Sequence, residues 1–273
     1  MKPAPFDHIR PEAAGAAAAA LSENAKIMAG GQSLGPMLNL RLARPTTIVG
    51  LGGISGLREV HERNGMLVIG AGVTHAMIED GTPSVELPPL LRHVARAIAY
   101  RAVRNRGTVG GSLAHADPAA DWVTTMTAIG ASVVALAADG KTRRIPMPQF
   151  MLGAYRTSLA PTEIIEAVEI PLAMRQAHWG YDKVCRKVGE FADAIGAFVV
   201  HPGSGYVRLV AGATGTKPAI LSDLAAGIAR TASRPDERNV KDALAAALPD
   251  LDRVKQHLLT TALCRAIEKV IPA

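Results

Sequence analysis

Cysteine is nearly absent from this 273-residue sequence, which contains only Cys185 and Cys264. Neither cysteine has a second Cys or a His at the spacing of metal ligands. Iron–sulfur clusters are held mainly by sets of four thiolates, and structural zinc sites need several Cys or His side chains together, so we expect the chain to carry neither by itself. Two distant cysteines also favour a reducing, cytoplasmic location.

Long apolar runs are also lacking, and residues 1–12 contain no basic segment followed by an apolar one. We therefore expect no membrane span and no secretion signal. Aromatic residues make up only 4% of the chain, which predicts a core of Ala, Val, Leu and Ile. The net charge of +6 would permit nucleic-acid binding, but the basic residues are scattered and no stacking aromatics lie among them. The densest basic stretch, residues 92–106, is more typical of a solvated or partner-facing helix surface.

Three motifs of nucleotide-binding and hydrolytic enzymes are missing. No G-x-G-x-x-G lies between a strand and a helix with an acid about 20 residues further on, which disfavours a Rossmann site. Gly140-Lys141-Thr142 lacks the upstream glycine of a P-loop. Residues 203–205 lack the spacing of a nucleophile elbow, and no Ser-His-Asp or Cys-His arrangement is evident. We therefore expect no hydrolytic catalysis, no catalytic residue and no metal ligand on this chain.

Two glycine-bearing strings, residues 29–33 and residues 108–112, stand out instead. Consecutive glycines tolerate positive φ and leave backbone N–H groups uncovered, so two facing turns of this kind can hold a diphosphate without a strongly basic pocket. Ser33, Thr108 and Ser112 would add hydroxyl donors. Either string alone is more often an ordinary turn. Taken together, the structural and the functional interpretations have about equal weight.

Periodicity and turn signals divide the chain into helices and strands. Leu38, Leu40 and Leu42 alternate as in a strand, and Pro45 ends that run. The clearest hairpin pairs 131–137 with 142–145. Residues 172–179 have linker character and mark the main domain boundary. The other expected helices are 11–21, 88–101, 222–231, 236–247 and 251–270, and the other expected strands are 26–29, 46–50, 59–62, 66–70, 163–170, 181–188, 194–200 and 206–213.

Two acidic residues and one histidine follow the second string. Asp117, which precedes a proline, is expected to be the N-cap of a new helix. Asp121 lies one turn further on and could direct its carboxylate, as an acceptor, toward ribityl or ribose hydroxyls. His115 has no acid or nucleophile beside it, and a lone histidine of this kind is more often structural than catalytic.

Several segments together resemble the FAD-binding medium subunit of molybdenum hydroxylases, the family of xanthine oxidase and aerobic carbon monoxide dehydrogenase. They are residues 29–34 (AGGQSL), 40–45 (LRLARP), 103–118, 160–165 and 186–192, together with Lys183. The segments keep the family's order and extend over nearly the whole chain.

The resemblance implies an α+β fold. An FAD-binding domain of the vanillyl-alcohol-oxidase type would consist of two subdomains, residues 1–55 and 56–175. A small α+β C-terminal domain, residues 176–273, would resemble that of the carbon monoxide dehydrogenase flavoprotein, with a three-stranded antiparallel sheet and helices.

The resemblance also implies which residues contact FAD. Those on the adenine and diphosphate side would be Lys26, Ile27, Met28, Ala29, Gly30, Gly31, Gln32, Ser33 and Leu34. The second string would complete the diphosphate grip through Gly107, Thr108, Gly110, Gly111 and Ser112, and Asp117 is counted with this site. Asp121 matches an acid that contacts the flavin polyol, and Ile164 and Ile165 match apolar residues beside the isoalloxazine. Lys183 and Phe191 match a basic residue at the polar edge of the ring and an aromatic near its face.

In this family the chemistry is divided among subunits. A large subunit holds the molybdenum–pterin centre and a small subunit holds two [2Fe–2S] clusters, which agrees with the scarcity of cysteine here. The resemblance implies that this chain carries FAD within a dimer of heterotrimers and passes electrons from the clusters to an external acceptor. A flavin-free scaffold subunit is the alternative, and a basic nucleic-acid-binding protein is a more distant one. The substrate and the acceptor are left open.

Three positions depart from the family pattern. Gly50 stands where an acid is often found, Ser112 where some relatives have Asn, and Ile98 where the xanthine oxidase branch has a ring-stacking aromatic. The last difference implies that the flavin is less tightly enclosed on that face.

Overall fold

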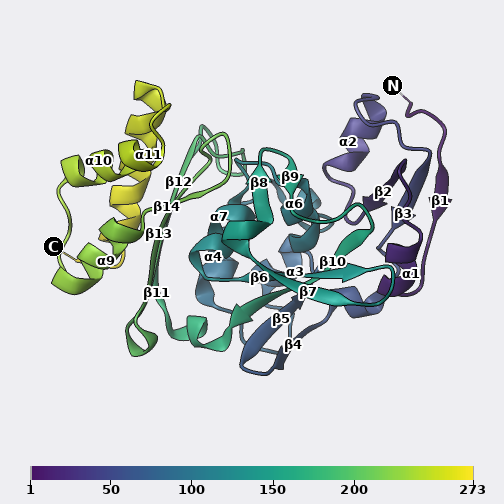
Figure 1. The fold of residues 1–273 in the computed structure, drawn as a ribbon, viewed down its shortest axis with the longest axis horizontal. Coiled ribbons are helices and arrows are strands. Elements are labelled where there is room, and N and C mark those ends of the chain that lie inside the picture. Colours follow the sequence, from purple (N-terminus) through teal and green to yellow (C-terminus); the bar gives the residue numbers. More distant parts are fainter. Residues whose placement is uncertain (1, 273) are drawn as a thin grey trace.

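The chain forms an α+β fold in which three larger sheets follow one another along the long axis (Figure 1). The structure is a computed structural model and describes residues 2–272. The first sheet is parallel, with the order β1-β3-β2, and consists of β1 (Asp7–Ile9), β2 (Ala25–Met28) and β3 (Thr47–Gly50). Helix α1 (Ala14–Ala19) joins β1 to β2, and α2 (Leu34–Asn39) follows the first glycine string.

The central sheet is antiparallel, with the order β4-β5-β10-β6-β7. A short 3₁₀ helix, Ser55–Arg58, leads into it. Its strands are β4 (Val60–Arg63), β5 (Met66–Gly70), β6 (Ser132–Ala137), β7 (Thr142–Pro146) and β10 (Glu163–Pro171). A small hairpin of β8 (Met151–Gly153) and β9 (Arg156–Thr157) follows helix α8 (Met147–Phe150). The helices of this part are α3 (His75–Asp80), α4 (Pro89–Arg96), α5 (Arg101–Arg104), α6 (Val109–His115), α7 (Asp121–Ala128) and α8 (Met147–Phe150).

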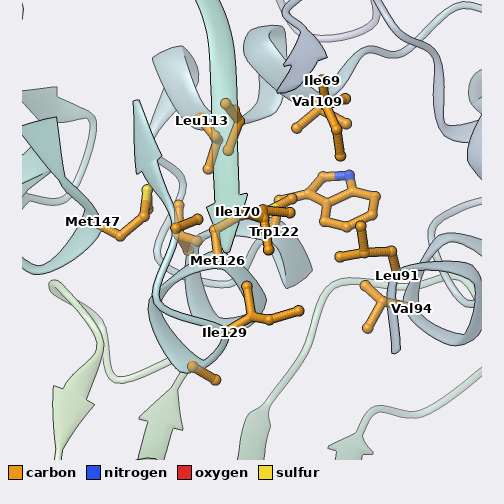
Figure 2. Close-up of a cluster of buried hydrophobic side chains, with 14 of the residues drawn as sticks. Ile69, Leu91, Val94, Val109, Leu113, Trp122, Met126, Ile129, Met147 and Ile170 are labelled. Atoms are coloured by element: carbon orange, nitrogen blue, oxygen red, sulfur yellow. The ribbon is translucent and has the colours of Figure 1, made fainter. Parts of the chain in front are cut away.

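The main core lies between this sheet and its helices. Trp122 of α7 is fully buried among aliphatic side chains of β5, α4 and α6, as Figure 2 shows. Alternate residues of the strands, such as Leu67 and Ile69, point into this core, as the two-residue period of a half-buried strand requires. Helix α1 packs on the other face of the sheet, where its alanines contact Leu136 and Ile164.

The C-terminal part is an antiparallel sheet with helices on its outer face. The strand order is β11-β12-β13-β14. The strands are β11 (His178–Val184), β12 (Ala194–His201), β13 (Tyr206–Gly212) and β14 (Ala219–Ile220), with 3₁₀ helices at Leu172–Gln176 and Pro202–Ser204. Helices α9 (Ser222–Thr231), α10 (Glu237–Ala247) and α11 (Arg253–Glu268) complete the chain. The sheet therefore has four strands, one more than expected, because the two-residue β14 extends it.

Several sequence-based predictions are confirmed and others are wrong. The hairpin of β6 and β7, strand β10 and helix α9 lie where they were expected. The alternating leucines do not form a strand: Leu38 is buried on helix α2, and the two that follow are exposed. Asp117 is not a helix N-cap, because α7 begins four residues later and the Asp117 carboxylate accepts a hydrogen bond from the Ala119 N–H instead, at 2.9 Å.

The expected linker at 172–179 contains a 3₁₀ helix and the start of β11. Helices α3 and α6 were not expected at all, and α6 includes part of the second glycine string. Within residues 2–272, no helix combines the length and hydrophobicity needed to cross a bilayer.

Candidate functional site

The two glycine strings meet at the junction of the N-terminal lobe and the central part. A Cβ on Gly30 would collide with the Arg106 carbonyl and with the backbone of Gly107. A Cβ on Gly111 would lie 3.6 Å from the Cβ of Ala29. The lack of a side chain at Gly30 therefore lets the first string lie directly against residues 106 and 107, which immediately precede the second string.

The first string is a turn with uncovered amides. Gly31 has a φ of 72°, in the left-handed region that favours glycine. Among the described residues, the backbone N–H groups of residues 30–33 donate to no protein acceptor. Successive free N–H groups around a left-handed residue form a concave anion-binding surface. Free amides around a left-handed glycine, as in this string, are typical of anion-binding turns.

The second string differs from the expected turn. Thr108 is the N-cap of α6, and its Oγ1 accepts a hydrogen bond from the Gly111 N–H at 3.0 Å. The N–H groups of Val109 and Gly110 donate to carbonyls of residues 73 and 71. Neither glycine of the string has a positive φ. The prediction of a second open turn is wrong, because the backbone N–H groups of residues 109–111 already donate to the Thr108 hydroxyl and to the carbonyls of residues 71 and 73.

Close packing explains Gly110 of the second string and Gly107, which directly precedes the string. A Cβ on Gly110 would strike Ala71, and one on Gly107 would lie 2.8 Å from Nε2 of His75. Two hydroxyl groups of this string can still bond to a ligand, that of Thr108 and that of the partly exposed Ser112.

Asp121 is the centre of a buried polar cluster that joins α7 to β11. Its side chain is only 5% exposed. Oδ1 accepts a hydrogen bond from the Tyr181 hydroxyl at 2.7 Å, and Oδ2 accepts one from Lys183 Nζ at 2.9 Å. Burial raises the pKa of Asp121, and the Lys183 ammonium opposes that rise. Burial and the neighbouring Asp121 carboxylate raise the pKa of Tyr181 well above its usual value.

This geometry shows what Asp121 does within the protein. Both carboxylate oxygens accept hydrogen bonds from protein donors inside the core. The Lys183 side chain is similarly enclosed, with 7% exposed, and its Nζ carries three N–H groups, of which one reaches Asp121 and one reaches the Ala97 carbonyl at 3.4 Å. The third has no partner among the described residues.

The apolar candidates do not gather on one surface. Ile164 packs toward α1, whereas Ile165 lies in the main core on the opposite face of β10. Both are buried, so they cannot line the same face of a ring with their side chains. Phe191 lies in the connection between β11 and β12 and is 65% exposed. The Asp117 carboxylate accepts hydrogen bonds from the Ala119 N–H and from the Tyr155 hydroxyl, the latter at 3.3 Å.

His75 is a site residue that the sequence interpretation missed. Its Nδ1 accepts a hydrogen bond from Trp122 Nε1 at 3.0 Å, which leaves the ring proton on Nε2, the atom that lies under Gly107. Burial lowers the pKa of His75 to about 4, and the positive charge of Arg104 adds to this effect. A neutral imidazole thus supports the second string. No periodicity or spacing in the sequence marked this contact, because its partners are distant in the chain.

The described residues contain no group of three His, Cys, Asp or Glu side chains close enough to share a metal ion. The candidate site is therefore defined by backbone amides, hydroxyls and one lysine.

Comparison with known proteins gives consistent matches. Residues 4–173 match the family model described as the FAD binding domain in molybdopterin dehydrogenase. The caffeine dehydrogenase subunit beta of a Pseudomonas species is 34% identical over 203 residues, which are 73% of this chain and 69% of that protein. The carbon monoxide dehydrogenase medium chain of Hydrogenophaga pseudoflava is 37% identical over 209 residues, 75% of this chain and 72% of the relative.

Solved structures extend the similarity to the C-terminal part. Carbon monoxide dehydrogenase from Hydrogenophaga pseudoflava has a chain with a TM-score of 0.87 and 29% identity, covering 99% of this chain and 98% of that one. Quinoline 2-oxidoreductase from Pseudomonas putida has one with a TM-score of 0.85 and 31% identity, with the same coverage.

Proposed function

Because the chain belongs to the family of FAD-binding domains in molybdopterin dehydrogenases, we propose that it is the FAD-carrying electron-transfer subunit of a heteromeric molybdenum hydroxylase. The chain is an oxidoreductase subunit of the medium, FAD-binding type. Bound FAD would take up electrons from the [2Fe–2S] clusters of a small partner subunit and release them to an external acceptor. The substrate would be oxidised at the molybdenum–pterin centre of a large partner subunit.

The observation that carries this proposal is the first glycine string. The free N–H groups of residues 30–33, around the left-handed Gly31, fit the oxygens of a diphosphate. A Cβ on Gly31 would meet only the Met28 side chain, at 3.5 Å. We assign the adenine and diphosphate side to residues 26–34, with Thr108 and Ser112 completing it across the junction.

The polar cluster at Asp121 would serve the ring end of the cofactor. Asp121 would orient Lys183, and the third N–H of Nζ would donate to an acceptor at the polar edge of an isoalloxazine bound against this cluster. Asp121 is thus a positioning residue. His75 would support the diphosphate end from beneath by fixing the position of Gly107.

The wider organisation is part of the same proposal. Two FAD-binding subdomains, residues 1–55 and 56–175, and a C-terminal domain, residues 176–273, would assemble with the large and the small subunit into a dimer of heterotrimers. A cytoplasmic location fits such an assembly. A flavin-free scaffold subunit of the same complex is the alternative, and the measurement below separates the two.

The test is the flavin content of the purified complex. Denaturation of the unsubstituted complex should release FAD in an amount equal to that of this chain, and release of no flavin would favour the scaffold. In Gly31→Val, a β-branched side chain at positive φ would distort the turn and obstruct the amides, so we expect at least tenfold less FAD.

A matched control is Gly65→Val. Gly65 has a φ of 74°, equivalent to that of Gly31, but lies in the hairpin between β4 and β5 with no atom near a Cβ. This variant carries the same backbone strain and should keep its flavin. Equal flavin loss in the two variants would mean that backbone strain causes the loss. It would contradict the proposed diphosphate site at residues 30–33.

A further inference from the structure

Arg104 of α5 has an almost enclosed guanidinium with four hydrogen bonds. Its side chain is 12% exposed. Nε and Nη2 donate to the two carboxylate oxygens of Glu79 at 2.7 and 3.0 Å, the bidentate geometry of a strong ion pair. Nη1 donates to the carbonyl oxygens of Ile98 and Ala99 at 3.1 and 2.9 Å. Although it belongs to the basic stretch 92–106, this side chain therefore binds its own chain.

The backbone that Arg104 holds is strained, and we call residues 97–99 the Ala99 turn. Ala99 has a φ of 45°, in the left-handed region that favours glycine. Such a conformation persists where the surrounding structure imposes it. The two carbonyls that accept from Arg104 belong to the peptide groups on either side of the Ala99 Cα. The guanidinium thus fixes both peptide groups of the strained residue.

Lys183 contacts the same turn from the C-terminal sheet. Its Nζ donates to the Ala97 carbonyl at 3.4 Å and to Asp121 at 2.9 Å. Ile98, the middle residue of the turn, stands at the position that we expect at one face of the flavin ring. The backbone of the Ala99 turn therefore determines where Lys183 and Ile98 lie relative to each other.

The connection between β11 and β12 also lies against the Ala99 turn. Gly189 of this connection has a φ of 95° and pairs with Ile98 in an isolated β-bridge. A Cβ on Gly189 would lie 2.6 Å from the Ala99 carbonyl oxygen. Phe191, the aromatic candidate for the ring face, follows two positions later. Candidates for the ring end from three separate segments therefore depend on one turn.

We propose that Arg104 is a positioning residue for the isoalloxazine end of bound FAD, because it fixes the turn that receives Lys183 and the connection carrying Phe191. This inference rests on the proposed function. A lysine at position 104 would keep the charge, but its single ammonium lacks the planar fork that serves a carboxylate and two carbonyls together.

The reduction potential of FAD should depend on this turn. The Lys183 ammonium would stabilise the negative charge that an isoalloxazine gains on reduction. If the Ala99 turn is loose, the Ala97 carbonyl no longer holds Nζ in place. The reduced form then loses stabilisation, and the potential falls.

The test is a redox titration of FAD in the full three-chain complex, together with the amount of FAD that denaturation releases. Arg104→Lys should keep its FAD and lower the midpoint potential by at least about 30 mV, a tenfold change in the equilibrium of a two-electron couple. Hydrogen exchange in peptides covering residues 97–99 and 186–192 should become at least tenfold faster.

The matched control is Arg101→Lys. Arg101 lies on the same helix and also pairs with Glu79, but among the described residues its guanidinium donates only to Glu79 and Asp80. Its potential and exchange should equal those of the unsubstituted complex. An unchanged potential in Arg104→Lys, an equal fall in Arg101→Lys, or loss of FAD from Arg104→Lys overturns the positioning role.

A second variant perturbs the turn without changing Arg104. Gly189→Ala places a Cβ against the Ala99 carbonyl and should lower the potential as Arg104→Lys does. Its control is Gly215→Ala, where φ is 84° and no atom lies within 4 Å of a Cβ, so that the backbone strain is similar and the turn is untouched. Equal potentials in these two variants overturn the proposal. FAD missing from the unsubstituted complex would instead reject the proposed function.

Discussion

At the scale of single residues, His75 shows how burial and one hydrogen bond define a protonation state. The Trp122 Nε1–H requires an unprotonated Nδ1 on His75, and the core around the ring disfavours an imidazolium. The same ring fills the space that a side chain at position 107 would occupy. Protonation of His75 would therefore disturb the support of the second glycine string.

This burial predicts a loss of stability in mild acid. The pKa of His75 is about 4 in the folded protein and 6.5 for an unperturbed histidine, so the unfolded chain binds more protons between these values. The full stability is present above pH 6.5 and is lost as the pH falls toward 4. We expect His75 to lower the free energy of unfolding by about 2 kcal/mol between pH 7 and pH 5.

Urea denaturation at the two pH values measures this effect. His75→Gln retains an acceptor for Trp122 and cannot titrate, so its loss between pH 7 and pH 5 should be smaller than that of the unsubstituted protein by the same amount. An identical pH dependence in the two proteins would show that His75 is not the titrating group.

The candidate site shows what residue patterns can and cannot predict. Glycine motifs predicted the two strings as parts of one site, and the resemblance to the family added Asp121 and Lys183 to that prediction. The patterns did not predict that Asp121 turns inward, because its partners on β11 are 60 and 62 residues away in the chain. They also assigned an open turn to residues 108–112, where the Thr108 cap and pairing with residues 71–74 make a helix start.

At the scale of elements, α11 lies against its sheet through backbone contacts. A Cβ on Gly180 of β11 would strike the Ala266 carbonyl, and one on Gly196 of β12 would strike the Ala262 carbonyl. The two alanines are one helical turn apart on α11, so the same face of the helix meets two glycines on neighbouring strands. Small residues on both sides allow this close approach.

We predict that Gly196→Ala destabilises the protein by at least about 1–3 kcal/mol, the typical effect of overpacking, because the obstructing atoms belong to the helix backbone and cannot rotate away. Thermal or urea unfolding measures the change. Gly227→Ala on α9 is the control: no atom lies near its Cβ, and alanine favours a helix, so stability should be unchanged or rise by up to about 1 kcal/mol. Equal effects of the two substitutions would contradict this packing.

The elements also show where sequence patterns are reliable. The hairpin of β6 and β7 was predictable because Asp139-Gly140 and its flanking strands are local signals. The strand expected at Leu38–Leu42 is wrong because an alternation of three leucines does not distinguish a strand from a helix end with two exposed residues.

At the scale of the whole molecule, the central and C-terminal sheets share one core around α7. All eight residues of α7 are buried. Its last turn is bound by β13, where the Tyr206 hydroxyl donates to the Ala128 carbonyl at 2.7 Å and Arg208 donates to the Thr127 carbonyl at 2.8 Å. The same hydrophobic cluster continues from β5 and α4 into β11, β12 and β13. The N-terminal lobe has a separate, smaller cluster.

This continuity predicts that residues 1–175 do not fold alone, although that segment is the proposed FAD-binding domain. Removal of the C-terminal sheet would expose helix α7. It would also remove four large side chains from the shared core, those of Tyr181, Ile195, Val199 and Val210. Each large apolar side chain contributes about 1.5–3 kcal/mol when buried, so the loss is comparable to the whole stability of a typical domain, about 5–15 kcal/mol. Loss of Lys183 also leaves the buried Asp121 carboxylate without its ion-pair partner, which adds to the loss of stability.

The fragment 1–175 should therefore be insoluble, or show no cooperative thermal transition and bind a hydrophobic dye. Co-expression with residues 176–273 as a second chain should restore a soluble complex with a cooperative transition, because the break falls in the 3₁₀ helix Leu172–Gln176 and leaves every strand of both sheets intact. A fragment 1–175 that melts cooperatively by itself would mean that α7 finds sufficient packing on the central sheet alone. The reassembled pair, by contrast, would show that the cofactor-binding half depends on the C-terminal sheet for its core.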